Sequence, residues 1–282
     1  MVKYIDSFVV STILTIAQPV PYASNLMNKM AEIIPRTSAN VNMPKTESSK
    51  NSENSEYRFK PIGFIESPYR QKFAIPRQPG LVPSARGIIH FTEEFAHSDC
   101  VRGIEAFSHL WLTFVFHETA AQGWKPLVRP PRLGGNMRKG VFATRSTFRP
   151  NPIGLSVVEL VAVEANKLIV RGLDLLHGTP ILDIKPYLPY SDSVSGALGG
   201  YADANPTTGM SVSFTPAAEA AILQHQHEYP ELRQLISEVL QQDPRPGYQR
   251  EQSWDKEYGM HLYDFNIKWR VIANDNHVIS IS

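Results

Sequence analysis

From Phe59 onward the chain is a succession of short apolar runs rich in β-branched and aromatic residues, separated by Pro, Gly, Asn and Ser. Such runs, with no long amphipathic helix between them, are typical of strands joined by turns. The pattern predicts strands at 59–66, 87–91, 110–117, 140–143, 155–163, 167–173, 181–184 and 210–214. The predicted fold class is therefore mainly β, with an antiparallel sheet curled into a barrel.

After Phe214 the periodicity becomes helical. Thr215 and Pro216 supply an N-cap and a proline for the first helical turn, and the pattern predicts helices at 217–228 and 231–241. Two further segments, 261–273 and 277–281, predict a closing hairpin. We therefore expect a barrel domain at 57–214 followed by a small α+β C-terminal domain at 215–282.

The first 56 residues differ from the rest. The apolar run 8–17 is shorter than the roughly 20 residues of a membrane helix. Residues 37–56 are almost wholly Ser, Asn, Thr, Lys and Glu, a composition that does not support a packed core. Met43 offers a second possible start. We therefore expect residues 1–56 to be a disordered or mis-assigned N-terminal extension.

Charge is balanced over the whole chain, with a formal net charge of +1, but not locally. No acidic residue lies between Glu118 and Glu159, and this acid-free segment carries Lys125, Arg129, Arg132, Arg138, Lys139, Arg145 and Arg149. Guanidinium groups pair with phosphates and carboxylates, so the segment suits an anionic ligand. A basic loop balanced by carboxylates elsewhere in the fold is the alternative. The single cysteine, Cys100, excludes an intrachain disulfide and fits a reducing compartment.

From residue 65 onward the chain contains several long and compositionally unusual strings. They are IESPY (65–69), FAIPRQPGL (73–81), GIEAFSHLW (103–111), RPPRLGGN (129–136), RSTFRPNPIG (145–154) and DIKPYLP (183–189), with QDPRPGY (242–248) and DFNIKWRV (264–271) in the tail. Through these strings, roughly residues 57–272, the chain resembles the TrmO-type (TsaA-like) tRNA methyltransferases. No G-x-G-x-x-G string follows a predicted strand, so a Rossmann nucleotide site is disfavoured.

The resemblance implies a barrel methyltransferase distinct from the Rossmann type, in a cytoplasmic homodimer with donor sites near the subunit interface. The implied reaction is the S-adenosylmethionine-dependent N6-methylation of N6-threonylcarbamoyladenosine at position 37 of threonine tRNA, in the anticodon loop. Positions that match the family's donor contacts are Pro76, Arg77, Gln78, His117, Glu118, Arg145, Leu155, Asp174, Leu175, Leu176 and His177. We expect glutamine where Glu118 stands and an acid where His177 stands, so these two contacts are in question.

Methylation of a weakly nucleophilic, urea-like nitrogen requires loss of its proton. We nominate Asp183 as the base, Lys185 as the group that orients it and Tyr187 as a residue packed near the target base. Candidate tRNA contacts in the acid-free segment are Arg129, Arg132, Arg149 and Asn151, with Phe148, Trp124 and Tyr187 as possible stacking residues. For each aromatic residue, core packing is the alternative.

Two other kinds of function stay open. A non-catalytic RNA-binding barrel would keep the basic loop but lose the donor pocket, and the residues at 118 and 177 keep this alternative alive. A hydrolase built on His117, Glu118 and Asp183 lacks a nucleophile motif. No metal is expected, because His109 and His117 lie eight residues apart without a third ligand.

Overall fold

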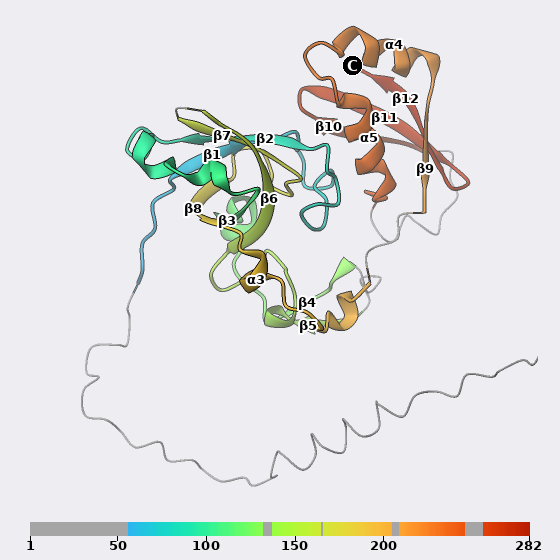
Figure 1. The fold of residues 1–282 in the computed structure, drawn as a ribbon. Coiled ribbons are helices and arrows are strands. Elements are labelled where there is room, and N and C mark those ends of the chain that lie inside the picture. Colours follow the sequence, from blue (N-terminus) through green and yellow to red (C-terminus); the bar gives the residue numbers. More distant parts are fainter. Residues whose placement is uncertain (1–55, 132–136, 165, 205–208, 246–255) are drawn as a thin grey trace, which may run out of the picture. The chain divides into compact units, whose positions relative to one another are not determined.

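A computed structural model describes residues 56–131, 137–164, 166–204, 209–245 and 256–282 (Figure 1). Residues 58–282 form one compact unit. The predicted N-terminal extension, except for its last residue, lies outside the described residues, as does Arg132.

Six strands close into an antiparallel barrel, as the sequence predicts. In the order in which they pair around the barrel they are β1 (Gly63–Glu66), β2 (Arg86–Phe91), β7 (Lys167–Arg171), β6 (Ile153–Glu164), β3 (His109–Val115) and β8 (Pro180–Pro186). β8 pairs back with β1 and so closes the sheet. Closure leaves the barrel without a free edge strand.

Side chains alternate between the interior and the outer face of the barrel wall, as the two-residue period of a strand requires. On β3, Leu110, Leu112 and Phe114 are buried, and the intervening residues face outward. Gly154 of β6 pairs with Phe114. A Cβ atom at position 154 would lie 2.3 Å from the Phe114 ring, so the glycine of the RPNPIG string is needed for interior packing.

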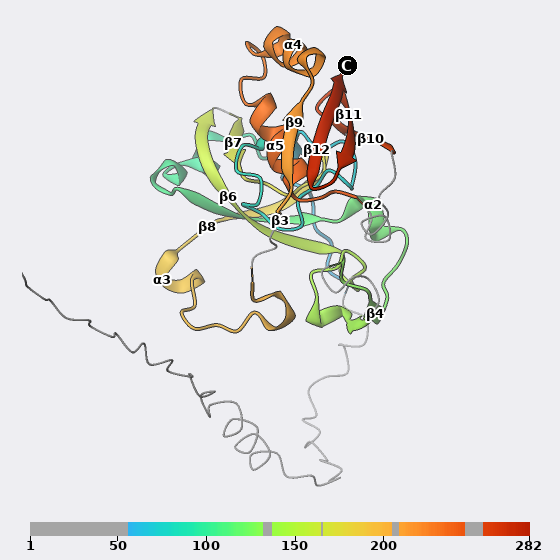
Figure 2. The same ribbon diagram turned by 90° about the vertical axis from the view of Figure 1, so that its right-hand side faces the viewer.

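The C-terminal residues form a second sheet. Its strands pair in the order β10 (Glu257–Leu262), β11 (Phe265–Ile272), β12 (Asp275–Ile281) and β9 (Ser211–Phe214). Two helices, α4 (Pro216–His225) and α5 (Leu232–Gln241), complete this α+β region (Figure 2). α5 buries the apolar stripe Leu232, Leu235, Ile236, Val239 and Leu240. The Thr215 hydroxyl caps α4 by accepting a hydrogen bond from the Ala218 N–H at 3.2 Å.

Three strand predictions require correction. β9, which we placed with the barrel strands, pairs in parallel with β12 of the second sheet. The arm predicted at 261–273 is two strands, because Tyr263 takes a φ of 51° in a turn and donates its N–H to the Pro68 carbonyl at 2.7 Å. The strand predicted at 140–143 is a two-residue strand, β5 (Lys139–Gly140), followed by a 3₁₀ turn, η4 (Val141–Ala143).

The other elements are short. β4 (Leu127–Val128) pairs with β5, and the remaining helical turns are η1 (Ser98–Val101), η2 (Ile104–Ala106), α2 (His117–Ala120), α3 (Pro189–Asp192) and η5 (Gly200–Ala202). Among the residues described, no helix has the length and apolar character needed to cross a membrane.

Candidate active site

A carboxylate held by the barrel wall lies at the centre of the candidate site. Asp174 lies in the loop between β7 and β8, and its Oδ1 atom accepts a hydrogen bond of 2.6 Å from Ser156 Oγ, an inward-facing residue of β6. Burial raises the pKa of Asp174 to about 6, although the Ser156 hydrogen bond and the charge of Arg145 favour the ionised form. A carboxyl group that titrates near neutrality is characteristic of a functional site.

Two further predicted donor residues meet beside this carboxylate. Arg145 Nη1 donates to Gln78 Oε1, and the Arg145 charge acts on Asp174. The loop that carries Gln78 is fixed to the barrel where the Gly80 N–H donates to the Gly172 carbonyl at 2.8 Å. Pro76 of this loop is buried and Arg77 is exposed. The structure therefore brings together three chain segments that the sequence treats separately: 76–78, 145 and 174.

The loop 174–177 is locked to the start of the barrel. Ser67 Oγ donates to the Leu175 carbonyl at 2.7 Å, and the His177 N–H donates to the Tyr69 carbonyl at 2.9 Å. The Leu175 side chain lies in the core, and Leu176 is half-buried. The bonds at Leu175 and His177 use the backbone of the loop and do not involve the side chain at 177.

His177 has a structural role that its sequence position does not reveal. Its Nδ1 atom accepts a hydrogen bond from the Ser67 N–H at 3.4 Å, which requires an unprotonated nitrogen. Burial, followed by the charge of Arg70, lowers the pKa of His177. The ring is therefore kept neutral, and it braces the loop where an acid was expected.

His117 and Glu118 lie in α2, directly after β3. His117 Nε2 lies 3.5 Å from Glu118 Oε1, and the Glu118 carbonyl accepts from the Gln122 side chain at 3.2 Å. The end of β3 is held by the Phe116 N–H, which donates to the Pro152 carbonyl at 2.8 Å. These contacts are local to α2 and differ from those that join Asp174, Arg145 and Gln78.

The remaining predicted donor residue, Leu155, lies on the other side of the barrel wall. It is 56% exposed, because its neighbour Ser156 takes the inward position. Thr113 of β3 pairs with Leu155 on one side and with Asp183 of β8 on the other. Leu155 and Asp183 therefore share the outer face of β6, β3 and β8, which we call the outer wall.

The nominated catalytic residues gather on this outer wall. Lys185 Nζ forms an ion pair with Asp183 Oδ2, and Asp183 Oδ1 accepts from the Ile184 N–H at 2.9 Å. The Tyr187 ring lies 5.9 Å from the Trp111 ring, centroid to centroid. Asp183 and Lys185 are thus a preformed carboxylate–ammonium pair beside an aromatic cluster.

The acid-free segment surrounds η4. Arg149 Nη1 donates to the carbonyl of Thr144 at 2.8 Å and to that of Val141 at 3.3 Å, so part of its guanidinium is used to hold this turn. Arg129 and Asn151 are exposed and available to a ligand. The Lys125 ammonium lies 4.3 Å from the centroid of the Phe148 ring.

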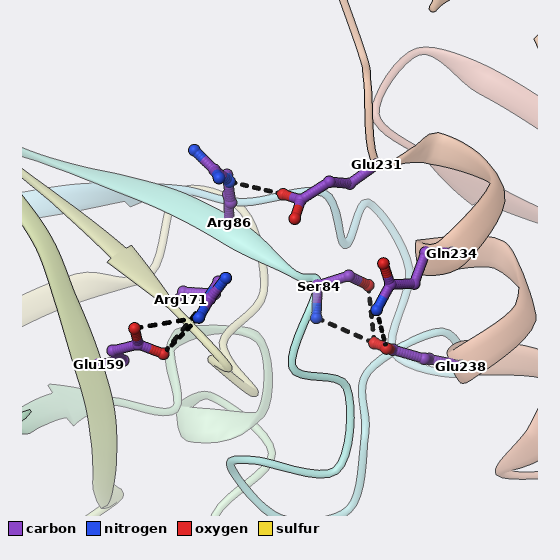
Figure 3. A network of polar contacts seen from close by, with 7 residues as sticks. All are labelled: Ser84, Arg86, Glu159, Arg171, Glu231, Gln234 and Glu238. Carbon is purple, nitrogen blue, oxygen red and sulfur yellow. Dashed lines mark hydrogen bonds and ion pairs between the residues drawn. The ribbon is translucent and has the colours of Figure 1, made fainter.

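A cavity lies beside the loop that carries Gln78, and an ion pair forms part of its lining. It has a volume of about 250 Å³, and its lining includes Pro79, His109, Glu159 and Arg171. Arg171 makes a forked ion pair with Glu159, with N···O distances of 2.9 to 3.1 Å (Figure 3). This ion pair holds the Arg171 and Glu159 side chains in position in the cavity lining.

The C-terminal helix α5 holds the same loop from the other end. Glu238 Oε2 accepts from both the N–H and the hydroxyl of Ser84, at 2.9 and 2.7 Å (Figure 3). Arg86 Nε donates to Glu231 Oε2, just before α5, at 2.6 Å. The loop 76–84 is therefore fixed by the barrel at Gly80 and by α5 at Ser84.

Three residues that matter here were missed from the sequence. Ser156 supports Asp174 and Ser67 supports the 174–177 loop, whereas the Tyr69 hydroxyl is buried without a hydrogen-bond partner among the described residues. Burial, followed by the Asp174 charge, raises the pKa of Tyr69. A polar residue at an inward position of an apolar strand was the available signal for Ser156.

No group of three or more His, Cys, Asp or Glu side chains within the described residues is arranged to hold a metal ion. Cys100 is exposed and unpaired.

The closed antiparallel barrel, which brings Asp174, Arg145 and Gln78 together, is a fold distinct from the Rossmann type. Residues 64–193 match the model of the tRNA-methyltransferase O N-terminal domain, and residues 207–282 match that of the TrmO C-terminal domain. The chain belongs to the tRNA-methyltransferase O (TrmO) family, as the motif strings indicated.

Individual relatives agree with this assignment. The chain is 54% identical over 221 residues to the tRNA (adenine(37)-N6)-methyltransferase of Escherichia coli (strain K12), an alignment that covers 77% of this chain and 94% of the relative. It is 47% identical over 210 residues to a putative S-adenosylmethionine-dependent methyltransferase, RcsF, of Pseudomonas aeruginosa, covering 74% and 90%. A crystal structure of TrmO from P. aeruginosa matches with a TM-score of 0.70 and 39% identity, covering 82% of this chain and 100% of that one.

Proposed function

We propose that this protein is an S-adenosylmethionine-dependent tRNA methyltransferase that methylates N6 of N6-threonylcarbamoyladenosine at position 37 of threonine tRNA. The observation that carries the proposal is the meeting of Asp174, Arg145 and Gln78, three positions that match the family's donor contacts. The 54% identity to a tRNA (adenine(37)-N6)-methyltransferase supports the same reaction. A tRNA substrate and a single cysteine support a cytoplasmic location.

The residues present fit a zwitterionic sulfonium donor. Arg145 is exposed and its guanidinium suits the donor's carboxylate. Asp174 offers negative charge to the cationic part of the donor. S-adenosylmethionine supplies an activated methyl group when it is bound, so the protein needs only to align the groups and exclude water.

The proton on N6 is the part of the reaction that the protein handles by acid–base chemistry. We assign Asp183 as its acceptor: the N–H bond breaks, the proton passes to the carboxylate, and the electron pair is left on nitrogen. Lys185 holds the carboxylate through their ion pair, and Tyr187 extends the aromatic cluster against which the base lies. Arg129, Asn151 and the rest of the acid-free segment bind the phosphates of the anticodon loop.

We further propose that the active unit is a homodimer joined through the outer wall. Leu155 and Ile153 are exposed apolar residues of β6, whereas Asp174 lies behind that wall. Leu155 can therefore contact a donor only at a site to which a second copy contributes. This arrangement accounts for a donor residue that one chain alone places apart from the others.

Separate measurements of donor binding and turnover test the assignment of the base. Asp183→Asn is expected to reduce turnover on threonylcarbamoylated tRNA by about 100-fold or more, while calorimetry shows wild-type affinity for S-adenosylmethionine. The control is Asp203→Asn, an exposed aspartate of the loop before β9, which is expected to act as wild type. Equal loss of turnover and donor binding in Asp183→Asn would show a structural or donor-binding role instead.

A further inference from the structure

The turn η4 turns one aromatic ring outward from the acid-free segment. Val141 is 2% exposed and anchors the turn in the core, whereas the next residue, Phe142, is 77% exposed. The sequence suggested Phe148, Trp124 and Tyr187 as stacking residues, but not Phe142. An aromatic ring exposed to solvent to this degree offers a face that a binding partner can cover.

The ring is presented by a well-ordered turn. The Val141 N–H donates to the Pro126 carbonyl at 3.0 Å, and Thr144 Oγ1 donates to the Val141 carbonyl at 2.8 Å. On the other side, the Tyr201 hydroxyl donates to the Ala143 carbonyl at 3.3 Å. The exposure of Phe142 therefore arises from a fixed backbone, which lowers the entropy cost of binding.

The charges around the ring suit a polyanion. The Arg149 guanidinium lies 5.9 Å from the Phe142 centroid and is itself held by the carbonyls of Val141 and Thr144. Arg145, a proposed donor residue, is three positions along the chain. By contrast, Phe148 is half-buried with the Lys125 ammonium over its ring.

We propose that Phe142 is a stacking platform for an unpaired base of the tRNA anticodon loop. The inference rests on the proposed tRNA substrate and adds a residue that receives a base, three positions before the proposed donor residue Arg145. Aromatic rings bind unpaired bases through their faces, and a neighbouring arginine adds a cation–π contact and a phosphate partner.

The test measures RNA affinity, donor affinity and mass separately on the full chain. The RNA probe is a labelled anticodon stem–loop of threonine tRNA at one fixed salt concentration. Phe142→Ala is expected to weaken RNA binding by at least about five-fold, with S-adenosylmethionine affinity unchanged. Phe142→Trp is expected to stay close to wild type, and Phe142→Leu to resemble the alanine variant.

The matched control is Phe59→Ala, which removes a phenylalanine of 66% exposure that lies before β1. It is expected to bind RNA as wild type. Unchanged RNA affinity in Phe142→Ala overturns the proposal, and so does a leucine variant as good as tryptophan. A change from dimer to monomer in Phe142→Ala would assign the ring to a contact between copies instead. If wild type binds the RNA but transfers no methyl group, the proposed reaction fails while the Phe142 contact is still decided by these affinities.

Discussion

At the scale of single residues, the candidate site depends on a carboxylate that the fold holds in an unfavourable environment. Asp174 has a pKa of about 6 because of its burial, and Ser156 and Arg145 offset only part of that cost. A donor with positive charge would complete the compensation. A carboxylate whose pKa is raised in this way is common at binding and catalytic sites.

A pH-dependent cost in stability follows from this pKa. Because the folded pKa lies above the ordinary value of 3.8, the native state binds more protons than the unfolded state between about pH 4 and 6. Stability from this group is therefore present at low pH and is lost as the pH rises through 6, by at most about 3 kcal/mol. The Asp174→Asn variant should lack this loss. Its free energy of unfolding is therefore expected to exceed that of wild type at pH 7.5 but not at pH 4.

Urea unfolding of both proteins at these two pH values checks the prediction, since other carboxyl groups titrate equally in both. Parallel stability profiles would contradict the raised pKa of Asp174. Calorimetry adds a second check, because S-adenosylmethionine affinity should rise with pH through 6 in wild type and be weaker and flatter in Asp174→Asn.

The sequence indicated Asp174 and Arg145 through the family resemblance, but it did not indicate what supports them. The alternation along β6 places Ser156 at an inward position, but only the folded structure shows that its hydroxyl donates to Asp174. His177 looked like the loss of a donor contact. Its ring accepts a hydrogen bond from a backbone N–H 110 positions away, a relation that no local pattern encodes.

At the scale of elements, the loop 76–84 depends on two supports far from it in sequence. Gly80 bonds to Gly172 of the barrel, and Ser84 bonds twice to Glu238 of α5. The C-terminal helix therefore takes part in shaping a loop that carries proposed donor residues. The relation could not be predicted, because α5 reads from sequence as an ordinary amphipathic helix.

Removal of this support should destabilise the protein measurably. Glu238→Ala leaves the buried Ser84 without an acceptor for its N–H and hydroxyl, and is expected to lower the free energy of unfolding by about 1–3 kcal/mol. Glu238→Gln should cost less, since its amide oxygen still accepts.

Glu219→Ala serves as the control. It breaks an exposed ion pair with Arg233 within the same region and should cost less than about 1 kcal/mol. The denaturant midpoints of Glu238→Ala, Glu238→Gln and Glu219→Ala measure these losses of stability. An equal effect of Glu238→Ala and Glu219→Ala would show that the bonds to Ser84 contribute no more than a surface pair.

Strands were predicted correctly where apolar and polar residues alternate clearly. The predictions failed where contacts distant in sequence determine how a strand pairs or where it ends. The barrel strands β3, β6 and β7 were found within a few residues. β9 was assigned to the wrong sheet because its apolar pattern suits either one, and only its pairing with β12 separates them. Apolar and polar residues alternate through most of the arm 261–273, and its turn at Tyr263 is accompanied by a hydrogen bond to Pro68.

At the scale of the whole molecule, the outer wall joins the two halves of the proposed site. It carries Asp183 and Lys185 together with the exposed apolar residues Ile153 and Leu155. Under the proposed function, this wall is both the contact between copies and the place where the base meets its proton acceptor. The closed barrel was predictable from many short strands, but which residues face outward follows from the register of the strands.

A charged residue in this wall should separate the copies. Leu155→Glu is expected to convert a dimer into a monomer in sedimentation experiments and to weaken S-adenosylmethionine binding by about ten-fold or more, because burial of a lone carboxylate opposes association. Leu223→Glu, at an exposed leucine of α4, is the control and should leave both unchanged. A Leu155→Glu protein with wild-type mass and donor affinity would contradict the proposed dimer.

Nucleoside mass spectrometry tests the central claim most directly. Threonylcarbamoylated threonine tRNA is incubated with the protein with and without S-adenosylmethionine, beside a methylase known to act on the same tRNA. The account predicts a donor-dependent gain of one methyl group on the modified adenosine at position 37. No gain while the control methylase is active, or a methyl group on any other nucleoside, would contradict it.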